Sequence, residues 1–380
     1  MKNIFKIVFV IIGTLIGAGF ASGQEMYIFF YSYGINGIFG LLVSSSLMGL
    51  IIYKTLKLIN NYNISNYKEF IDIIINKNFK HEYLNIKNIL NIIINIFILI
   101  TFFIMIAGFG AYFEQVLKIN HFFGSIILAS LCFIVFQTSV KGLVKVNELL
   151  IPFLIILICL IGIFNFTQIN FENSINNISK FNSSGWLLNS LLYASYNSIL
   201  LIPTLITLKN YIKNKKNIFI IGLFSTIIVM TLSTFLFFIL SNIDIEIATL
   251  EMPVVYAVGK MANFLIYIYG FIIVSSIFTT SIALGTSFLQ NTAKNKKSYT
   301  LIACIMCITA VVVSNFGFAK LVNLLYPIFG YLGFVQIVRL LIIKININKS
   351  KKKLLQKKQW YSKIKLPYGK GDSNKWKIFG

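Results

Sequence analysis

The sequence predicts an all-α integral membrane protein with about ten transmembrane helices. Two features of its composition point to this class: 57% of the 380 residues are hydrophobic and only 12% are charged. Soluble domains are about one quarter charged, so the shortage of charge is the more informative value. The third feature is that the apolar residues gather in runs of roughly 20, the length that crosses the hydrocarbon core as a helix. A membrane β-barrel would show short alternating segments instead.

Ten such runs can be placed along the chain. We expect helices at about 4–33, 37–58, 88–117, 121–140, 147–166, 185–208, 217–241, 261–290, 298–316 and 319–345. Together they define a membrane domain at residues 1–345. The lysine-rich segment 346–380 follows, and we expect a basic cytoplasmic tail that is disordered and attracted to anionic membrane lipid.

The distribution of positive charge predicts the orientation of the chain. The net charge is +23, from 34 Lys and Arg against 11 Asp and Glu. With a cytoplasmic N-terminus, 30 of those 34 residues fall on the cytoplasmic side, and the other four are Lys118, Lys180, Lys260 and Lys320. This split agrees with the positive-inside rule. We therefore expect a protein of the bacterial cytoplasmic (inner) membrane with both termini inside, and we attribute its basic charge to orientation rather than to nucleic acid binding.

Two loops are expected to have structure of their own. Residues 66–79 place Phe70, Ile73 and Ile74 at helical spacing, which indicates a short amphipathic helix on the inner membrane surface. Residues 242–260 carry three acids and a proline, and we expect them to fold over the outer mouth of the protein.

The first run contains an unusual density of glycine. Gly13, Gly17, Gly19 and Gly23 fall within eleven positions, and each costs about 1 kcal/mol relative to alanine inside a helix. One interpretation is close helix packing through small residues. The other is a break in the helix, which membrane proteins tolerate where the unwound backbone is buried or lines a cavity. The polar residues that follow, up to Glu25, favour the break.

A second interruption is expected in the sixth run, where Ser195, Tyr196 and Asn197 lie at mid-span and Pro203 follows. Runs one and six are five apart. Two interrupted helices at corresponding positions of two five-helix halves are typical of an inverted-repeat transporter. The sequence therefore predicts a 5+5 inverted repeat with helices 1 and 6 discontinuous, its halves spanning about 1–166 and 185–345.

The motif Gly-Thr-x-Ile-Gly-Ala-Gly-Phe-Ala-Ser-Gly-Gln-Glu at residues 13–25 resembles the opening of the YkvI family of bacterial membrane proteins. Ala-Gly-x-Gly-Ala-x-x-Glu at 107–114 and Ala-Ser-Tyr-Asn at 194–197 add to the resemblance, which covers residues 4–345. That family is similar to the amino acid–polyamine–organocation superfamily, with the five-plus-five fold of the bacterial leucine transporter. The resemblance implies a secondary active transporter that carries out cation-coupled symport of a small solute, an amino acid or a related amine.

The solute is expected between the two breaks. Its predicted site consists of backbone from the first run, a small surface in the third and side chains from the sixth: Ala18, Gly19, Phe20, Gly108, Ser195, Tyr196 and Asn197.

The resemblance also implies a sodium site between runs one and eight. Its carbonyl ligands would be Gly13 and Ile16, and its hydroxyl ligands would come from Ser276, Thr279 and Thr280, which share one helical face. Oxygen ligands suit a hard cation. The alternative is that these hydroxyls bond to backbone carbonyls, as buried Ser and Thr commonly do.

Two carboxylates inside runs are candidate proton carriers, because an intramembrane charge is costly unless it has a role. Glu25 opens the second half of run one, and Glu114 lies near the outer end of run three. Either could carry a proton or pair with an ammonium group of the solute. The alternative for each is an interfacial carboxylate that reaches water.

Other classes of protein fit less well. His81 and His121 fall in loops on opposite sides, and no nucleotide-binding or hydrolase motif is present, so we expect neither an enzyme nor a cofactor beyond a coupling Na⁺ or H⁺. The competing class is a ligand-sensing receptor subunit of the same fold, similar to the membrane subunits of germinant receptors.

Overall fold

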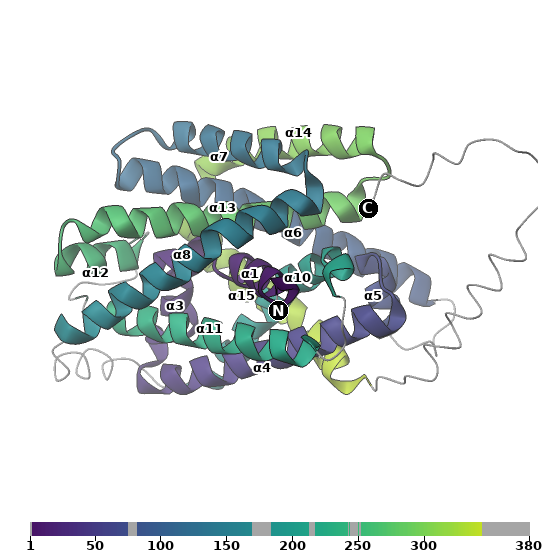
Figure 1. Ribbon diagram of the computed structural model, residues 1–380, viewed down its shortest axis with the longest axis horizontal. Helices are drawn as coiled ribbons and strands as arrows, with labels where there is room; N and C mark the ends of the chain where they lie inside the picture. Colours follow the sequence, from purple (N-terminus) through teal and green to yellow (C-terminus); the bar gives the residue numbers. More distant parts are fainter. Residues whose placement is uncertain are drawn as a thin grey trace, which may run out of the picture. The chain divides into compact units, whose positions relative to one another are not determined.

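The computed structural model describes residues 2–74, 82–168, 184–212, 217–241, 243, 250 and 252–343. The predicted tail at 346–380 lies outside the described residues. The described part contains helices and no strand (Figure 1). This confirms the predicted all-α class.

The first half of the chain forms α1 (Lys2–Leu15), α2 (Ala18–Ser22), α3 (Gln24–Phe29), the 3₁₀ turn η1 (Tyr31–Tyr33), α4 (Ile35–Tyr62), α5 (Tyr67–Ile74), α6 (Glu82–Gln115), α7 (His121–Phe136) and α8 (Ser139–Gln168). The second half forms α10 (Trp186–Thr207), η2 (Lys209–Tyr211), α11 (Asn217–Leu240), α12 (Pro253–Met261), α13 (Leu265–Thr292), α14 (Lys296–Val313), η4 (Ser314–Phe316) and α15 (Phe318–Ile342).

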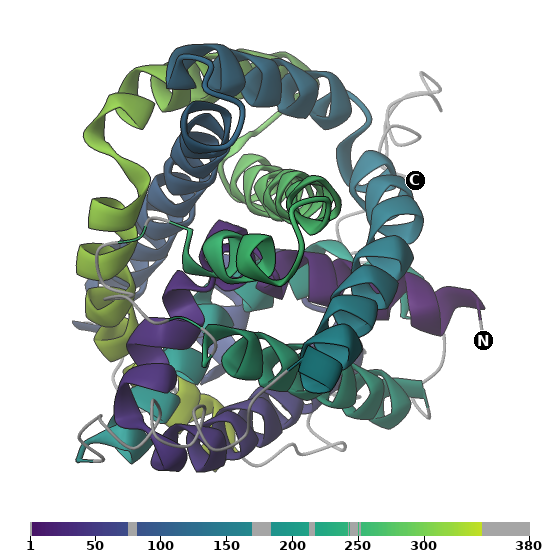
Figure 2. The ribbon, with the colours of Figure 1, turned by 90° about the vertical axis from the view of Figure 1, so that its left-hand side faces the viewer.

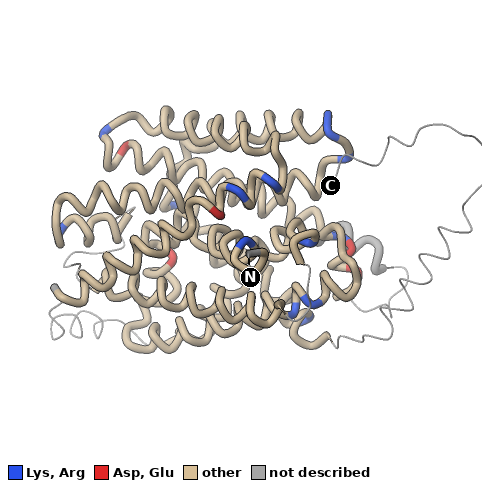
Figure 3. Tube along the Cα trace, in the orientation of Figure 1, with Lys and Arg blue, Asp and Glu red and all other residues tan. Residues whose placement is uncertain are grey.

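Each of the ten predicted runs coincides with a helix or a broken helix. Eight helices in the described residues are long and apolar enough to cross a membrane. Two shorter apolar helices, Asn3–Leu15 and His121–Phe136, account for the first and fourth runs. Long stretches of these helices carry no charged residue (Figure 3).

The two halves pack against each other in a reciprocal way. The second membrane span of the first half is α4, and it packs along α10, the first membrane span of the second half. Likewise α11, the second helix of the second half, packs along α1. Such exchange of partners is the arrangement expected for an inverted repeat. Among the long apolar helices α10 is the most buried, followed by α6 and α13, and Figure 2 shows α13 surrounded by other helices.

The predicted break in the first helix is confirmed. Hydrogen bonding of α1 ends at Ile16, and Gly17 adopts an extended conformation (φ −95°, ψ −166°) before α2 begins. A second turn follows at Gly23, whose φ of 89° lies in the left-handed region that favours glycine. The glycines therefore divide the first span into three short helices.

The predicted break in the sixth helix is wrong. Helix α10 runs without interruption from Trp186 to Thr207. Its mid-span polar side chains bond to carbonyls of their own helix: Ser195 Oγ donates to Leu191 O at 2.6 Å, and Asn197 Nδ2 donates to Tyr193 O at 3.0 Å. Because these groups are satisfied locally, the helix has no need to unwind.

The loop helices pack on the bundle. Helix α5 forms as predicted, but Tyr67, Phe70 and Ile71 are buried against protein, in a helix that packs on α6, α10 and α15, rather than lying on lipid. Helix α12 packs on α2, α11 and α13. It thereby lies against the broken segment of the first span.

Candidate functional site

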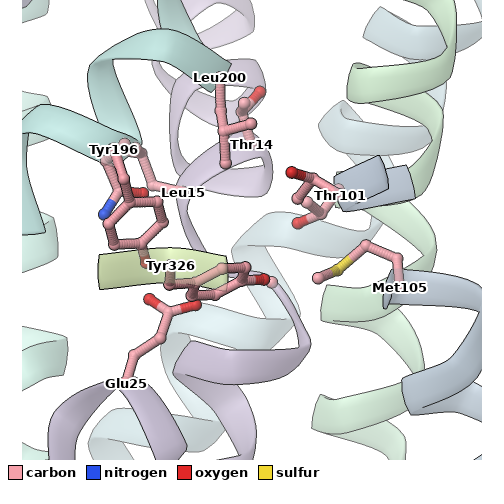
Figure 4. Close-up of a pocket in the computed structure, with 11 residues that line it drawn as sticks. Thr14, Leu15, Glu25, Thr101, Met105, Tyr196, Leu200 and Tyr326 are labelled. Carbon is pink, nitrogen blue, oxygen red and sulfur yellow. The ribbon is translucent and has the colours of Figure 1, made fainter. Parts of the chain in front are cut away.

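A small internal cavity lies beside the break between α1 and α2 (Figure 4). Its volume of about 10 Å³ is close to that of one water molecule. Side chains and backbone from the first span, α6, α10, α13 and α15 line it: Thr14, Leu15, Gly17, Glu25, Thr101, Met105, Tyr196, Asn197, Leu200, Thr280 and Tyr326.

Glu25 is the one charged side chain among the described residues that line the cavity. It is only 3% exposed, and its Oε2 atom has no hydrogen-bond partner within the described part of the chain. Its carboxyl group points toward the rings of Tyr196 and Tyr326 (Figure 4). A Cβ atom at Gly19 would overlap Glu25 Oε1, so glycine at that position makes room for the carboxyl group. A buried carboxylate with no cationic partner among the described lining residues is costly, which indicates a functional role.

A stack of aromatic rings forms one side of the site. The ring centroids of Tyr196 and Tyr326 are 4.8 Å apart with an interplanar angle of 23°. Phe29 also stacks on Tyr196, with ring centroids 5.5 Å apart and an interplanar angle of 22°. The stack thus joins α3, α10 and α15. The Tyr196 hydroxyl interacts with the Glu25 carboxyl group, without a close hydrogen bond to any residue described.

Thr280 is the one predicted sodium-site hydroxyl that contacts the predicted carbonyls. Its Oγ1 donates across helices, at 2.7 Å to Gly13 O and at 3.1 Å to Ile16 O. Gly13 lies in the last turn of α1 and Ile16 directly follows that helix, where backbone oxygens lack partners within the helix. Thr280 therefore ties the broken end of α1 to α13.

The other two predicted hydroxyls turn back on their own helix. Thr279 Oγ1 lies 3.0 Å from Ser275 O and 3.1 Å from Ser276 O. Ser276 Oγ donates to Ile273 O at 2.9 Å. Both follow the alternative that the sequence left open, in which buried hydroxyls bond to backbone.

The predicted solute-binding residues divide into two groups. Tyr196 and Asn197 line the cavity. Ala18 and Gly108 instead bring α2 and α6 together, because a Cβ at Gly108 would lie 3.0 Å from Ala18 Cβ. Gly19, Phe20 and Ser195 are buried but are not among the residues that line the cavity.

Several of the residues that line the cavity were not predicted from the sequence. Thr101 is a single hydroxyl in a long apolar run, and Tyr326 precedes a proline inside a span, so both carried a weak signal. Met105 carried none. Its Sδ accepts a hydrogen bond from Ala18 N at 3.4 Å and thus helps to hold the start of α2.

Glu114 lies away from the cavity. Its side chain is 63% exposed, and its Oε2 is 3.6 Å from His121 Nδ1. This placement favours the interfacial carboxylate that the sequence left as an alternative.

All of the residues that line the cavity are buried, so the cavity is shut off from solvent. At one end, Gln24 Nε2 donates to Leu250 O, and a Cβ at Gly23 would overlap Val254 of α12.

The protein has the fold of the bacterial leucine transporter. This class is indicated by the broken first span, the reciprocal packing of the two halves and the buried polar cavity, and comparison with solved structures agrees. MhsT in complex with L-phenylalanine matches with a TM-score of 0.67 at 14% identity, over 87% of each chain. A Na⁺-coupled sialic acid symporter in a substrate-bound outward-open state matches with a TM-score of 0.50 at 12% identity, over 87% of this chain and 75% of that one.

Sequence comparison narrows the resemblance to the family predicted above. The chain is 29% identical over 341 residues to the uncharacterized membrane protein YkvI of Bacillus subtilis (strain 168), covering 88% of this chain and 94% of YkvI. It is also 24% identical over 349 residues to the uncharacterized protein YyaD of the same organism, covering 90% and 96%. The predicted resemblance to YkvI is confirmed. No family model matches the chain.

Proposed function

We propose that this protein is a secondary active transporter that couples the movement of a small solute, an amino acid or a related amine, to a cation gradient. The observation that carries the proposal is the cavity at the break in the first span, which is lined by the buried carboxylate of Glu25 and by other residues that are all buried. A site that is buried on every side has the occluded arrangement through which alternating access passes. The fold is that of structural neighbours that include a Na⁺-coupled symporter.

Sodium is the coupling ion that we propose, at the carbonyls of Gly13 and Ile16 and the hydroxyl of Thr280. Hard cations of this size bind oxygens at about 2.3–2.6 Å, so neighbouring ligands of one ion stand roughly 3.3 Å or more apart. Thr280 Oγ1 lies closer than this to both carbonyls, at 2.7 and 3.1 Å. Ion entry would therefore spread these oxygens and replace the hydrogen bonds with coordination. Ser276 and Thr279 could join only after leaving their present partners.

The proton is the other candidate coupling ion, with Glu25 as its carrier. Glu25 lies inside the cavity and Glu114 does not, so only Glu25 would meet the solute. We place the protein in the bacterial cytoplasmic membrane with both termini inside, as the lysine distribution predicts.

Uptake into proteoliposomes that contain the full-length chain tests the function. Amino acids and small amines are screened under an inward sodium gradient, an inward proton gradient and no gradient, with protein-free liposomes as the control. We expect one solute to accumulate above its outside concentration under the sodium gradient. Accumulation under the proton gradient alone would indicate that the proton is the coupling ion, with Glu25 as its candidate carrier. Binding of a solute that no gradient moves would reject transport and favour the receptor alternative.

A further inference from the structure

We propose that the solute is a compact organic ammonium ion, with its nitrogen at Glu25 and its alkyl part against Tyr196 and Tyr326. This inference rests on the proposed function and names the class of its substrate. Four observations lead to it: the charge balance of the cavity, the direction of its hydrogen bonds, the aromatic faces and the apolar remainder of the lining.

The charge balance favours a cation. Glu25 is buried and faces the cavity, and the lining residues that the structure describes include no lysine, arginine or histidine. A buried charge is stabilised by an opposite charge at hydrogen-bond distance. A ligand that carries one positive charge would supply it. A zwitterion would bring a carboxylate for which the described lining residues offer no cationic side chain, so that only the proposed sodium ion could pair with it.

The threonine and asparagine donors of the cavity are in use. Thr14 Oγ1 donates to Val10 O at 2.7 Å, and Thr101 Oγ1 donates to Phe97 O at 2.9 Å. Thr280 donates to α1, and Asn197 Nδ2 donates within α10. Their oxygens keep free lone pairs, so these four side chains present acceptors to the cavity, and the hydroxyl of Tyr196 is a donor that remains. An ammonium group has three donors and no acceptor, which complements this lining.

The aromatic stack distinguishes an organic cation from a bare metal ion. The rings of Tyr196 and Tyr326 stand beside the carboxyl group of Glu25 (Figure 4). A cation near a tyrosine face is attracted by the ring quadrupole, by about 2 kcal/mol or more when desolvated. The remaining lining includes Leu15, Met105 and Leu200, which suit alkyl carbons. A bare sodium ion binds oxygen ligands and would not be stabilised by these apolar side chains.

The ligand must also be small. The closed cavity holds about 10 Å³, so even a short alkylammonium ion requires side chains to move when it binds. Met105 is flexible enough to make room. Larger movement would have to separate the stacked rings.

Binding to the purified full-length protein, at constant ionic strength in KCl, tests the assignment. The probes are propylammonium, L-2-aminobutyrate (the same carbon chain with a carboxylate added), 1-propanol and NaCl. We expect propylammonium to bind at least tenfold more tightly than L-2-aminobutyrate or 1-propanol. Equal or tighter binding of L-2-aminobutyrate would overturn the proposal. So would sodium binding that depends on Glu25 without any binding of propylammonium.

Variants locate the site. Glu25→Gln keeps the shape of the side chain and should weaken propylammonium binding at least tenfold, whereas the exposed Glu114→Gln should leave it unchanged. Tyr326→Phe keeps the ring and should bind within about threefold of the original, whereas Tyr326→Leu should bind at least fivefold more weakly. Unchanged affinity in Glu25→Gln would overturn the assignment. If that variant does not fold, the probe series on the unmodified protein still decides.

Uptake separates this inference from the function on which it rests. Uptake of L-2-aminobutyrate without uptake of propylammonium would keep transport and overturn the ammonium site. Tight binding of propylammonium that depends on Glu25, with no uptake above protein-free liposomes, would keep the site and reject transport.

Discussion

Thr280 connects two helices through one hydroxyl group. Its hydrogen bonds reach Gly13 O and Ile16 O, two carbonyls that the break in the first span leaves without helical partners. One side chain therefore serves as the cap of α1 and, in our proposal, as an ion ligand. The two roles exclude each other at any moment, because the hydroxyl oxygen and the ion compete for the same carbonyls.

Replacing Thr280 by valine should destabilise the protein and remove its response to sodium. Thr280→Val keeps the shape and leaves two buried carbonyls without a donor, at a cost of about 1–3 kcal/mol. Thr279→Val is the matched control, because that hydroxyl bonds only within α13 and its loss should cost less than about 1 kcal/mol. Thermal unfolding gives the stabilities, and uptake with and without sodium gives the coupling. Sodium stimulation that survives in Thr280→Val would reject the proposed ion site.

At the scale of residues, the sequence predicted some of the residues that line the cavity and not others. Glu25, Tyr196 and Asn197 were predicted because polar groups in apolar runs are conspicuous. Thr101 and Met105 could not be predicted, because their place at the cavity depends on how α6 is rotated against the first span. That rotation is decided by tertiary packing, such as the close approach of Gly108 to Ala18.

At the scale of elements, the two predicted breaks had different physical bases. The break in the first span rested on glycine, whose backbone freedom is used at Gly17 and Gly23. The break in α10 rested on polar side chains, and these can equally bond to their own helix, as Ser195 does. Glycine density was therefore the more reliable indicator. The buried face of α5 was missed for a related reason, since amphipathicity does not say whether protein or lipid covers the apolar side.

The approach of α1 to α8 gives a prediction at this scale. A Cβ atom at Gly13 would overlap Asn147 Oδ1 and lie 3.0 Å from Ile151 Cδ1. We expect Gly13→Ala to destabilise the protein by about 1–3 kcal/mol, because either Asn147 must give up its hydrogen bond to Leu143 O or α1 and α8 must move apart. Gly222→Ala is the control, since its nearest neighbour would lie at 3.4 Å. Thermal unfolding of purified variants measures the difference.

The companion variant identifies the cause. In Gly13→Ala with Asn147→Ala the obstructing amide is absent, and we expect most of the lost stability to return. A double variant as unstable as Gly13→Ala alone would show that the contact with Asn147 is not what limits the approach.

At the scale of the whole molecule, the fold class and the ten spans were predictable because span length and hydropathy are set by the bilayer and not by tertiary contacts. The five-plus-five arrangement was implied by the resemblance, whereas the reciprocal pairing of α4 with α10 and of α1 with α11 came from the structure. The closed state of the cavity was not predictable, because it depends on loop contacts such as Gln24 with Leu250.

The proposed orientation predicts which loops are reached from outside the cell. Lys320 and Lys296 are both exposed, and the ten-span topology places them on opposite sides of the membrane. In a background without the native cysteines, a membrane-impermeant maleimide should label Lys320→Cys in intact cells and leave Lys296→Cys unlabelled until the cells are lysed. The reverse pattern would invert the topology and contradict the positive-inside assignment.

The single carboxylate in the cavity also makes the proposed cycle electrical. With an ammonium ion at ionised Glu25 the loaded site is neutral, whereas the empty site carries one negative charge. A membrane potential acts on an elementary charge with up to about 2.3 kcal/mol per 100 mV. An inside-negative potential would therefore turn the empty site outward. It would also drive inward the carrier that is loaded with both the ammonium ion and the proposed sodium ion, because that carrier has a net charge of +1. The membrane potential alone would then favour import, because it would hold the empty site open to the outside of the cell.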